Sequence, residues 1–234
     1  TVVDRKADVP AAVAALLALG CSVAVGGSVT LQETGVLDLL RSCAAPVAGA
    51  CAINSMEELC ETKNTQPCMF AVELAAAAAL REAGIRADMA AGFSLGELAA
   101  LTYGGAMDFE TGFSLVCRRA EHMQKAAEAR DTAMAAVLKL TPDAVIALCA
   151  DFAEVYPVNF NCPGQITVSA AAEQMPAFLA AVKAAGGRAI PLKVRGGFHS
   201  PFMAEAAKAF AADLAAAKLN APALPVYANR TAQP

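Results

Sequence analysis

The 234-residue chain contains no tryptophan and only two histidines, and its eight cysteines form no Cys-x-x-Cys pair. A zinc site is not expected, because such sites use closely spaced Cys and His ligands. A disulfide framework is not expected either, since such frameworks stabilise short secreted chains with small cores. Here 57% of a long sequence is hydrophobic. We therefore expect reduced thiols and a cytoplasmic protein.

Basic charge is also scarce, with 18 Lys and Arg side chains against 22 Asp and Glu, for a net charge of -4. Such a chain lacks the positive field that attracts a phosphate backbone, so nucleic acid is not an expected partner. The length is sufficient for one large domain, or for one domain that carries a smaller insert.

No charged residue occurs from Val9 to Gln32, and this stretch is long enough to suggest a membrane-spanning helix. It is rich in alanine and interrupted by glycines, however, and the residues before it mix acidic with basic side chains, unlike a signal peptide. We interpret residues 11–19 as a buried helix and 21–25 as a buried strand, with a span or signal as the alternative. No membrane partner is expected.

One pentapeptide that is present, Gly92-Phe93-Ser94-Leu95-Gly96, follows a short apolar run and precedes a helical Glu-Leu-Ala-Ala-Leu. Gly-x-Ser-x-Gly between a strand and a helix is the pattern of a nucleophile elbow. The Ser94 hydroxyl would stand at the helix N-terminus, where the Leu95 N–H can stabilise an oxyanion. A tight turn without chemistry is the alternative.

Before and after this turn the sequence predicts helices with recognisable starts. Ser55 and Glu58 form a capping-box pattern that begins a short helix. Thr65-Gln66-Pro67 begins a second helix, which runs to Ala83 and is apolar on nearly all faces. Asp108 is predicted to cap a third helix, over 109–129.

Beyond residue 130 the pattern changes to strand, helix, strand, strand, helix, strand. The predicted ranges are 133–140, 142–152, 155–161, 165–170, 173–185 and 188–194. This βαββαβ order is that of a ferredoxin-like unit. A helix from Ser200, with Met203, Ala207, Phe210 and Leu214 on one face, and a strand over 224–228 complete the chain.

His199 is the candidate partner of the serine, because glycines precede it and a helix follows it. A helix N-terminus disfavours imidazolium, which would keep His199 neutral and able to accept a proton. A structural role is the alternative for His199. The other histidine, His122, is interpreted as a solvated side chain in mid-helix.

Four motifs together resemble the malonyl-CoA:acyl carrier protein transacylases, the acyltransferase family of type II fatty acid synthesis. They are Gly92 to Glu97, Thr65-Gln66-Pro67, Asn159 to Gln165 and Gly197 to Pro201. The resemblance runs from Met56 to Pro234.

The resemblance implies an α/β fold, with an α/β-hydrolase-like core and an inserted ferredoxin-like subdomain. The core would be residues 54–130 and 196–234, and the insert 131–195. Residues 1–53 are predicted to form an α/β segment that does not match the family and has no assigned role.

The resemblance also makes Ser94 the nucleophile, His199 its base and Arg119 the residue that holds a substrate carboxylate. Phe198 would crowd a methylmalonyl substrate, and Leu95 would supply an oxyanion donor. The implied reaction moves a malonyl group from malonyl-CoA to the phosphopantetheine thiol of acyl carrier protein by a ping-pong mechanism. It needs no metal and no cofactor.

An acidic carrier protein would need a basic patch, for which Arg118, Lys125, Lys193 and Arg195 are candidates. The chain departs from the family in three ways: Phe93 stands where the family usually has histidine, residues 1–53 contain no Gly-Gln-Gly turn, and the family continues beyond Pro234. The missing turn supplies a second oxyanion donor in the family.

Three alternatives stay open. The chain can be the acyltransferase domain of a fatty acid or polyketide synthase, a serine hydrolase that releases malonate, or an incomplete and inactive fragment. Arg119 argues against a simple hydrolase, because lipid esters carry no carboxylate for it to bind.

Overall fold

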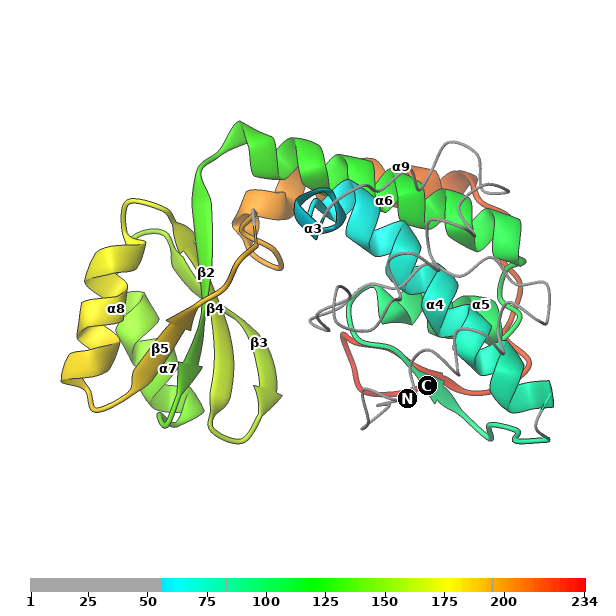
Figure 1. Ribbon diagram of the computed structural model, residues 1–234, viewed down its shortest axis with the longest axis horizontal. Helices are drawn as coiled ribbons and strands as arrows, with labels where there is room; N and C mark the ends of the chain where they lie inside the picture. The colour runs from blue at the N-terminus through cyan, green and yellow to red at the C-terminus, as the bar shows by residue number, and fades with distance from the viewer. Residues whose placement is uncertain (1–55, 83, 195) are drawn as a thin grey trace. The chain divides into compact units, whose positions relative to one another are not determined.

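The computed structural model describes residues 56–82, 84–194 and 196–234 (Figure 1). The predictions for residues 1–53, and the proposed cap at Ser55, lie outside this range. The described chain forms two compact units, one comprising the residues up to Ala120 and from Asp213 onward, the other Glu121–Ala212.

The first unit contains the serine motif. Its helices are α3 (Met56–Leu59), α4 (Thr62–Glu82), α5 (Gly96–Tyr103) and the start of α6 (Phe109–Ala129), and its strands are β1 (Ala90–Ala91) and β6 (Val226–Tyr227). β1 and β6 pair in parallel, with Ala90 opposite Val226 and Ala91 opposite Tyr227. The predicted strand over 224–228 is therefore present but shorter.

Helix α4 begins earlier than predicted, at Thr62, so Pro67 lies inside it rather than in its first turn. The reason is local: the Asn64 and Thr65 amides both donate to the Glu61 carbonyl, so the chain turns directly from α3 into the new helix. Among the positions of α4 whose burial is described, only Lys63 and Arg81 are exposed, as suits a helix that is apolar on nearly all faces. It buries positions such as Cys68 and Phe70 and leaves many neighbouring residues half-buried.

Helix α6 has the predicted bounds, and its predicted cap is present. The Thr111 amide donates to Asp108 Oδ1 at 2.8 Å. Hydrogen bonding from the Thr111 side chain, and then from its amide, favours the charged carboxylate and lowers the pKa of the Asp108 carboxyl.

The second unit contains β2 (Thr132–Leu138), α7 (Pro142–Ala150), β3 (Val155–Cys162), β4 (Gln165–Ala171), α8 (Met175–Ala184) and β5 (Arg188–Pro191). This is the predicted order of elements. The strands form one antiparallel sheet in the order β3-β4-β2-β5. β2 ends earlier than predicted because Lys139 adopts a φ of 69°, outside the extended region.

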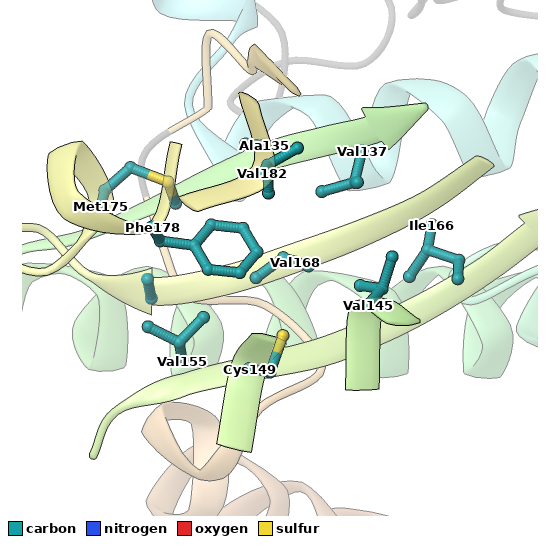
Figure 2. Close-up of a cluster of buried hydrophobic side chains, with 11 residues drawn as sticks. Ala135, Val137, Val145, Cys149, Val155, Ile166, Val168, Met175, Phe178 and Val182 are labelled. Carbon is teal, nitrogen blue, oxygen red and sulfur yellow. The ribbon is translucent and has the colours of Figure 1, made fainter. Parts of the chain in front are cut away.

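The core of this unit lies between the sheet and its two helices (Figure 2). Alternate residues of β4, Ile166, Val168 and Ala170, face it because successive side chains of a strand point to opposite sides. From the helices, Val145 of α7 and Phe178 of α8 pack against them with no exposed surface.

After β5 the chain enters a single 3-10 turn, Pro201–Met203, and then α9 (Ala204–Ala216). Ser200 caps this start as predicted, since the Phe202 amide donates to its Oγ at 3.3 Å. The predicted apolar face is partly wrong: Met203 is buried, but Ala207 is exposed and Ala206 is buried in its place. None of the helices in the described ranges has the length and apolar character needed to cross a membrane.

The Phe178→Ala substitution should lower the free energy of unfolding of the second unit by about 3–5 kcal/mol, because it leaves a cavity in a fully buried core. Urea unfolding measures it. Ile146→Ala is the control on the adjacent helix, where the side chain is 45% exposed, and should change stability by about 0.5 kcal/mol or less. Equal losses in the two variants would contradict the observed packing.

Candidate active site

Ser94 lies in the turn that joins β1 to α5. Its backbone has a φ of 54°, a left-handed conformation that costs energy for any residue except glycine. The turn is held by the Gly96 amide, which donates to the Phe93 carbonyl at 2.9 Å, and by the Glu97 amide, which donates to the Ser94 carbonyl at 3.2 Å. This strand–turn–helix geometry is the one expected of a nucleophile elbow.

Gly92 is required by the close approach of strand and helix. A Cβ atom at Gly92 would stand 1.8 Å from the Gly96 carbonyl oxygen and 2.6 Å from the Glu97 nitrogen, both of which are backbone atoms. At Gly96 a Cβ would meet only the Glu73 carboxylate, at 3.6 Å or more. Of the two glycines in the motif, Gly92 is therefore the one that the close approach requires.

Arg119 reaches the serine from α6. Its Nη2 donates to Ser94 Oγ at 3.1 Å, and its Nη1 donates to the Gln66 side-chain oxygen. Burial lowers the pKa of the Arg119 guanidinium, and the negative charge of Glu97 acts in the opposite direction. Arginine starts from so high a pKa that the group remains charged. The hydroxyl of Ser94 thus lies beside a partly buried positive charge.

Asn229 follows β6 and holds the same turn from the other side. Its Oδ1 accepts the Ser94 amide at 2.7 Å, and its Nδ2 donates to the Gly92 carbonyl. Its own backbone amide donates to Glu97 Oε1 at 2.9 Å. Because β6 runs parallel to β1, the residues that follow the two strands meet at one edge.

His199 and Phe198 lie in the second unit, just before the 3-10 turn that leads into α9. His199 is exposed and has a φ of 61°. Ser200 Oγ donates to the Gly197 carbonyl at 2.5 Å and accepts a hydrogen bond from the Phe202 amide. One hydroxyl thus bonds to backbone groups that precede and follow His199 in the chain. The Phe198 ring packs against the Gly196 backbone, where a Cβ would lie 2.7 Å from the ring.

The structure therefore brings Ser94, Leu95 and Arg119 together in the first unit, and places His199 beside Phe198 in the second. Within the described residues, four non-glycine residues have a positive φ: Ser94, Lys139, His199 and Ala232. Two of the four are the predicted nucleophile and its predicted base. Backbone strain of this kind gathers at functional sites.

A pocket of about 670 Å³ lies beside the elbow, between α4, β1 and α5, with Glu73, Phe93 and Tyr103 among its lining residues. Phe93 is 65% exposed. Burial raises the pKa of the Glu73 carboxyl. Its Oε2 is buried and has no hydrogen-bond partner among the residues that the structure describes.

Sequence reasoning assigned no role to Gln66, Glu97 or Asn229. Gln66 belongs to the Thr65-Gln66-Pro67 motif, and the structure shows that its side-chain oxygen accepts a hydrogen bond from Arg119. The available signal for Asn229 was a polar residue directly after a short apolar strand. His122, interpreted as solvated, is half-buried.

The candidates for the expected basic patch do not all belong to one unit. Arg118 in the first unit forms an ion pair with Asp213 at 3.1 Å. Lys125 and Lys193 belong to the second unit, and Arg195 lies outside the described residues. The ranges that the structure describes hold no group of three or more His, Cys, Asp or Glu side chains that could bind a metal.

Comparison with known proteins matches residues 29–234 to the acyl transferase domain family. The chain is 38% identical over 212 residues to the malonyl CoA-acyl carrier protein transacylase of Synechocystis, covering 89% of this chain and 71% of that protein. It is 39% identical over 178 residues to the Escherichia coli K12 protein of the same name, covering 74% of this chain and 58% of that one.

Solved structures agree with this match. The acyl-carrier-protein S-malonyltransferase of Burkholderia pseudomallei superposes with a TM-score of 0.76 at 32% identity, over 96% of this chain and 69% of that one. The Clostridium perfringens transacylase gives a TM-score of 0.71 at 33% identity, over 76% of this chain and 57% of that one. The molecule therefore has the mixed α/β fold of these acyl transferases.

The chain belongs to the acyl transferase family that includes the malonyl CoA-acyl carrier protein transacylases. The resemblance drawn from the four motifs is confirmed. The family match begins at residue 29, upstream of Met56, where the motif resemblance begins. The chain spans 71% of the Synechocystis relative and 58% of the Escherichia coli relative.

The Gly92→Ala substitution should abolish the elbow, because its Cβ would collide with backbone that no side-chain rotation can move. We expect the free energy of unfolding to fall by about 3 kcal/mol or more, together with loss of Ser94 labelling by a fluorophosphonate probe. Gly96→Ala is the matched control, where the added Cβ makes an ordinary contact, and should keep both properties. Similar behaviour of the two variants would contradict the close approach at Gly92.

Proposed function

We propose that this chain transfers a malonyl group from malonyl-CoA to the phosphopantetheine thiol of acyl carrier protein, through a malonyl ester on Ser94. The observation that carries the proposal is the hydrogen bond from Arg119 to Ser94 Oγ at 3.1 Å. A malonyl group is a thioester carbonyl with a carboxylate two carbons away. A guanidinium beside the nucleophile therefore suits a substrate that must present both groups at one point.

The geometry supports an exchange of partners at Arg119. With no substrate, Nη1 is bound to Gln66 and Nη2 to Ser94. An incoming carboxylate would take the Nη2 donor, which releases the serine hydroxyl to attack the adjacent thioester. Gln66 would keep the guanidinium plane in place during this exchange.

In the proposed mechanism His199 removes the Ser94 proton as the hydroxyl oxygen attacks the thioester carbon. The Leu95 N–H, at the start of α5, stabilises the oxyanion. The intermediate collapses, the C–S bond breaks, and the CoA sulfur leaves with the proton held by His199. The phosphopantetheine thiol then gives its proton to His199 and attacks the serine ester. The bond between Ser94 Oγ and the acyl carbon breaks, and His199 returns the proton to Oγ, which regenerates the free serine and the neutral base. The reaction needs no metal or cofactor.

Selectivity would come from the charge of Arg119. An acetyl group has no carboxylate, so it would leave a partly buried guanidinium without its anionic partner. Phe198, beside the proposed base, would crowd a substrate with an α-methyl group. Acyl carrier protein is the proposed partner because a relative at 36% identity has a solved structure described as a type II PKS acyl-carrier protein in complex with its malonyl-transacylase.

The finer description of the fold belongs to the same proposal. We propose an α/β-hydrolase-like core of residues 54–130 and 196–234, supported by the strand–elbow–helix sequence and the parallel pairing of β1 with β6. We propose a ferredoxin-like insert of residues 131–195, supported by the sheet order β3-β4-β2-β5. The scattered cysteines favour a cytoplasmic location.

A second candidate is the acyltransferase domain of a larger synthase. It is favoured by a 38% identity over 193 residues to the polyketide biosynthesis protein ThaF of Burkholderia thailandensis, of which the match covers only 16%. A coding sequence that continues into further synthase domains would support this candidate. The chemistry proposed for Ser94 is the same in both.

Intact-mass spectrometry after mixing with malonyl-CoA should show one malonyl adduct, which is absent in Ser94→Ala. In Arg119→Ala the rate of adduct formation should fall by about 10- to 100-fold, as expected for loss of hydrogen bonds to a charged group. Arg119→Lys tests whether charge alone suffices, and it should restore only part of the rate because lysine cannot form the planar fork.

Two outcomes would contradict the proposal. A folded protein that forms no adduct with malonyl-CoA would show that the chain lacks the activity. Labelling of Ser94 by acetyl-CoA at the malonyl-CoA rate would show that Arg119 does not select the carboxylate.

A further inference from the structure

We propose that Asn229 is the positioning residue of Ser94: its side-chain amide clamps the backbone of the elbow and thereby sets the reactivity of the serine hydroxyl. This inference rests on the proposed function of Ser94 as a nucleophile. Asn229 would contact neither substrate nor the reacting atoms, and would act only through the conformation of residues 92–94.

The clamp consists of two hydrogen bonds to backbone groups on either side of Phe93. Asn229 Oδ1 accepts the Ser94 N–H at 2.7 Å, and Nδ2 donates to the Gly92 carbonyl. These are the two bonds that a neighbouring peptide group would make in a parallel sheet. The last paired residues of the two strands are Ala91 and Tyr227. The Asn229 side chain thus continues the ladder for one more step, into the turn.

The hydrogen bond from the Ser94 N–H to Asn229 acts on the residue whose backbone is strained. Ser94 has a φ of 54°, which the surrounding structure must hold in place. Gly92 makes the close approach sterically possible, but sterics do not orient the Ser94 peptide. The bond from Ser94 N–H to Asn229 does, because an amide hydrogen bond fixes the direction of the peptide plane.

The two backbone groups that Asn229 contacts need one hydrogen-bond acceptor and one donor, which the asparagine side chain supplies. A side-chain amide offers one acceptor and one donor on the same carbon and in one plane, as the Ser94 N–H and the Gly92 carbonyl require. An aspartate has nearly the same shape and keeps the acceptor. It cannot donate when ionised, and its second oxygen would face the Gly92 carbonyl oxygen.

Glu97 links the clamp to the charge on the other side of the serine. Its Oε1 accepts the Asn229 backbone amide at 2.9 Å, and its negative charge is the one that acts on Arg119. The elbow is therefore held by Asn229, which follows β6, and by Arg119 on α6. Glu97 accepts a hydrogen bond from Asn229, and its negative charge also acts on Arg119.

The test measures two rates of Ser94 modification, by malonyl-CoA in a single turnover and by a fluorophosphonate probe that needs no carboxylate. Asn229→Ala should lower the maximal rate of malonylation by about 100-fold, the cost expected of a small misplacement of the nucleophile. The concentration of malonyl-CoA at half-maximal rate should change by less than about 3-fold, because Arg119 and Gln66 are untouched. The fluorophosphonate rate should fall in parallel with malonylation.

Asn229→Asp is the isosteric variant, and it should also react at least about 10-fold more slowly because the donor to Gly92 is lost. It tests the proposal in a folded protein even where Asn229→Ala unfolds, which thermal melting would show. Asn220→Ala is the matched control in the same unit. Asn220 is exposed, its described hydrogen bond is made by its backbone amide, and its substitution should change neither rate.

Three results would overturn the inference: a wild-type rate in folded Asn229→Ala, a wild-type rate in Asn229→Asp, or weaker apparent binding of malonyl-CoA with an unchanged maximal rate. Failure of the proposed function looks different. In that case wild-type protein forms no malonyl adduct, while the fluorophosphonate rate still reports whether Asn229 controls Ser94.

Discussion

The arrangement of the site depends on the contact between the Gly92 backbone and the Gly96 carbonyl. No side chain fits between them, since even a Cβ would stand 1.8 Å from the oxygen. This approach forces the intervening residues into a tight turn and puts Ser94 at a positive φ. The serine hydroxyl then meets Arg119 and its amide meets Asn229. One steric constraint thus places both polar groups of the serine.

The proposed selectivity for malonyl over acetyl groups depends on the incompletely compensated charge of Arg119. Its two described hydrogen bonds go to neutral groups, the Gln66 amide oxygen and the Ser94 hydroxyl. Neutral partners repay the cost of burying a charge less fully than a carboxylate does. A carboxylate substrate would therefore gain from an interaction already oriented toward it. The same guanidinium would remain poorly satisfied with a neutral acyl group.

The parts of this molecule that could be predicted from sequence depend on local patterns. The elbow, the Asp108 cap and the strand–helix order of residues 132–191 each follow from residues that are neighbours in the chain. The clamp on Ser94 could not be predicted in the same way. Asn229 is 135 positions from Ser94, and the two meet only because β6 pairs with β1 in parallel. The position of Pro67 inside α4 differs in kind: it depends on a local turn at Glu61, which the sequence pattern does not indicate.

Ser94 and His199 share one physical property although they belong to different units. Each has a left-handed backbone, and near each of them one short polar side chain makes two hydrogen bonds to backbone groups. At Ser94 this is the amide of Asn229, and at His199 it is the hydroxyl of Ser200, which joins the Gly197 carbonyl to the Phe202 amide. Strain of this kind persists only where the surroundings enforce it. Each unit therefore fixes the backbone of one residue to which the proposed chemistry assigns a role, and that chemistry requires both residues at once.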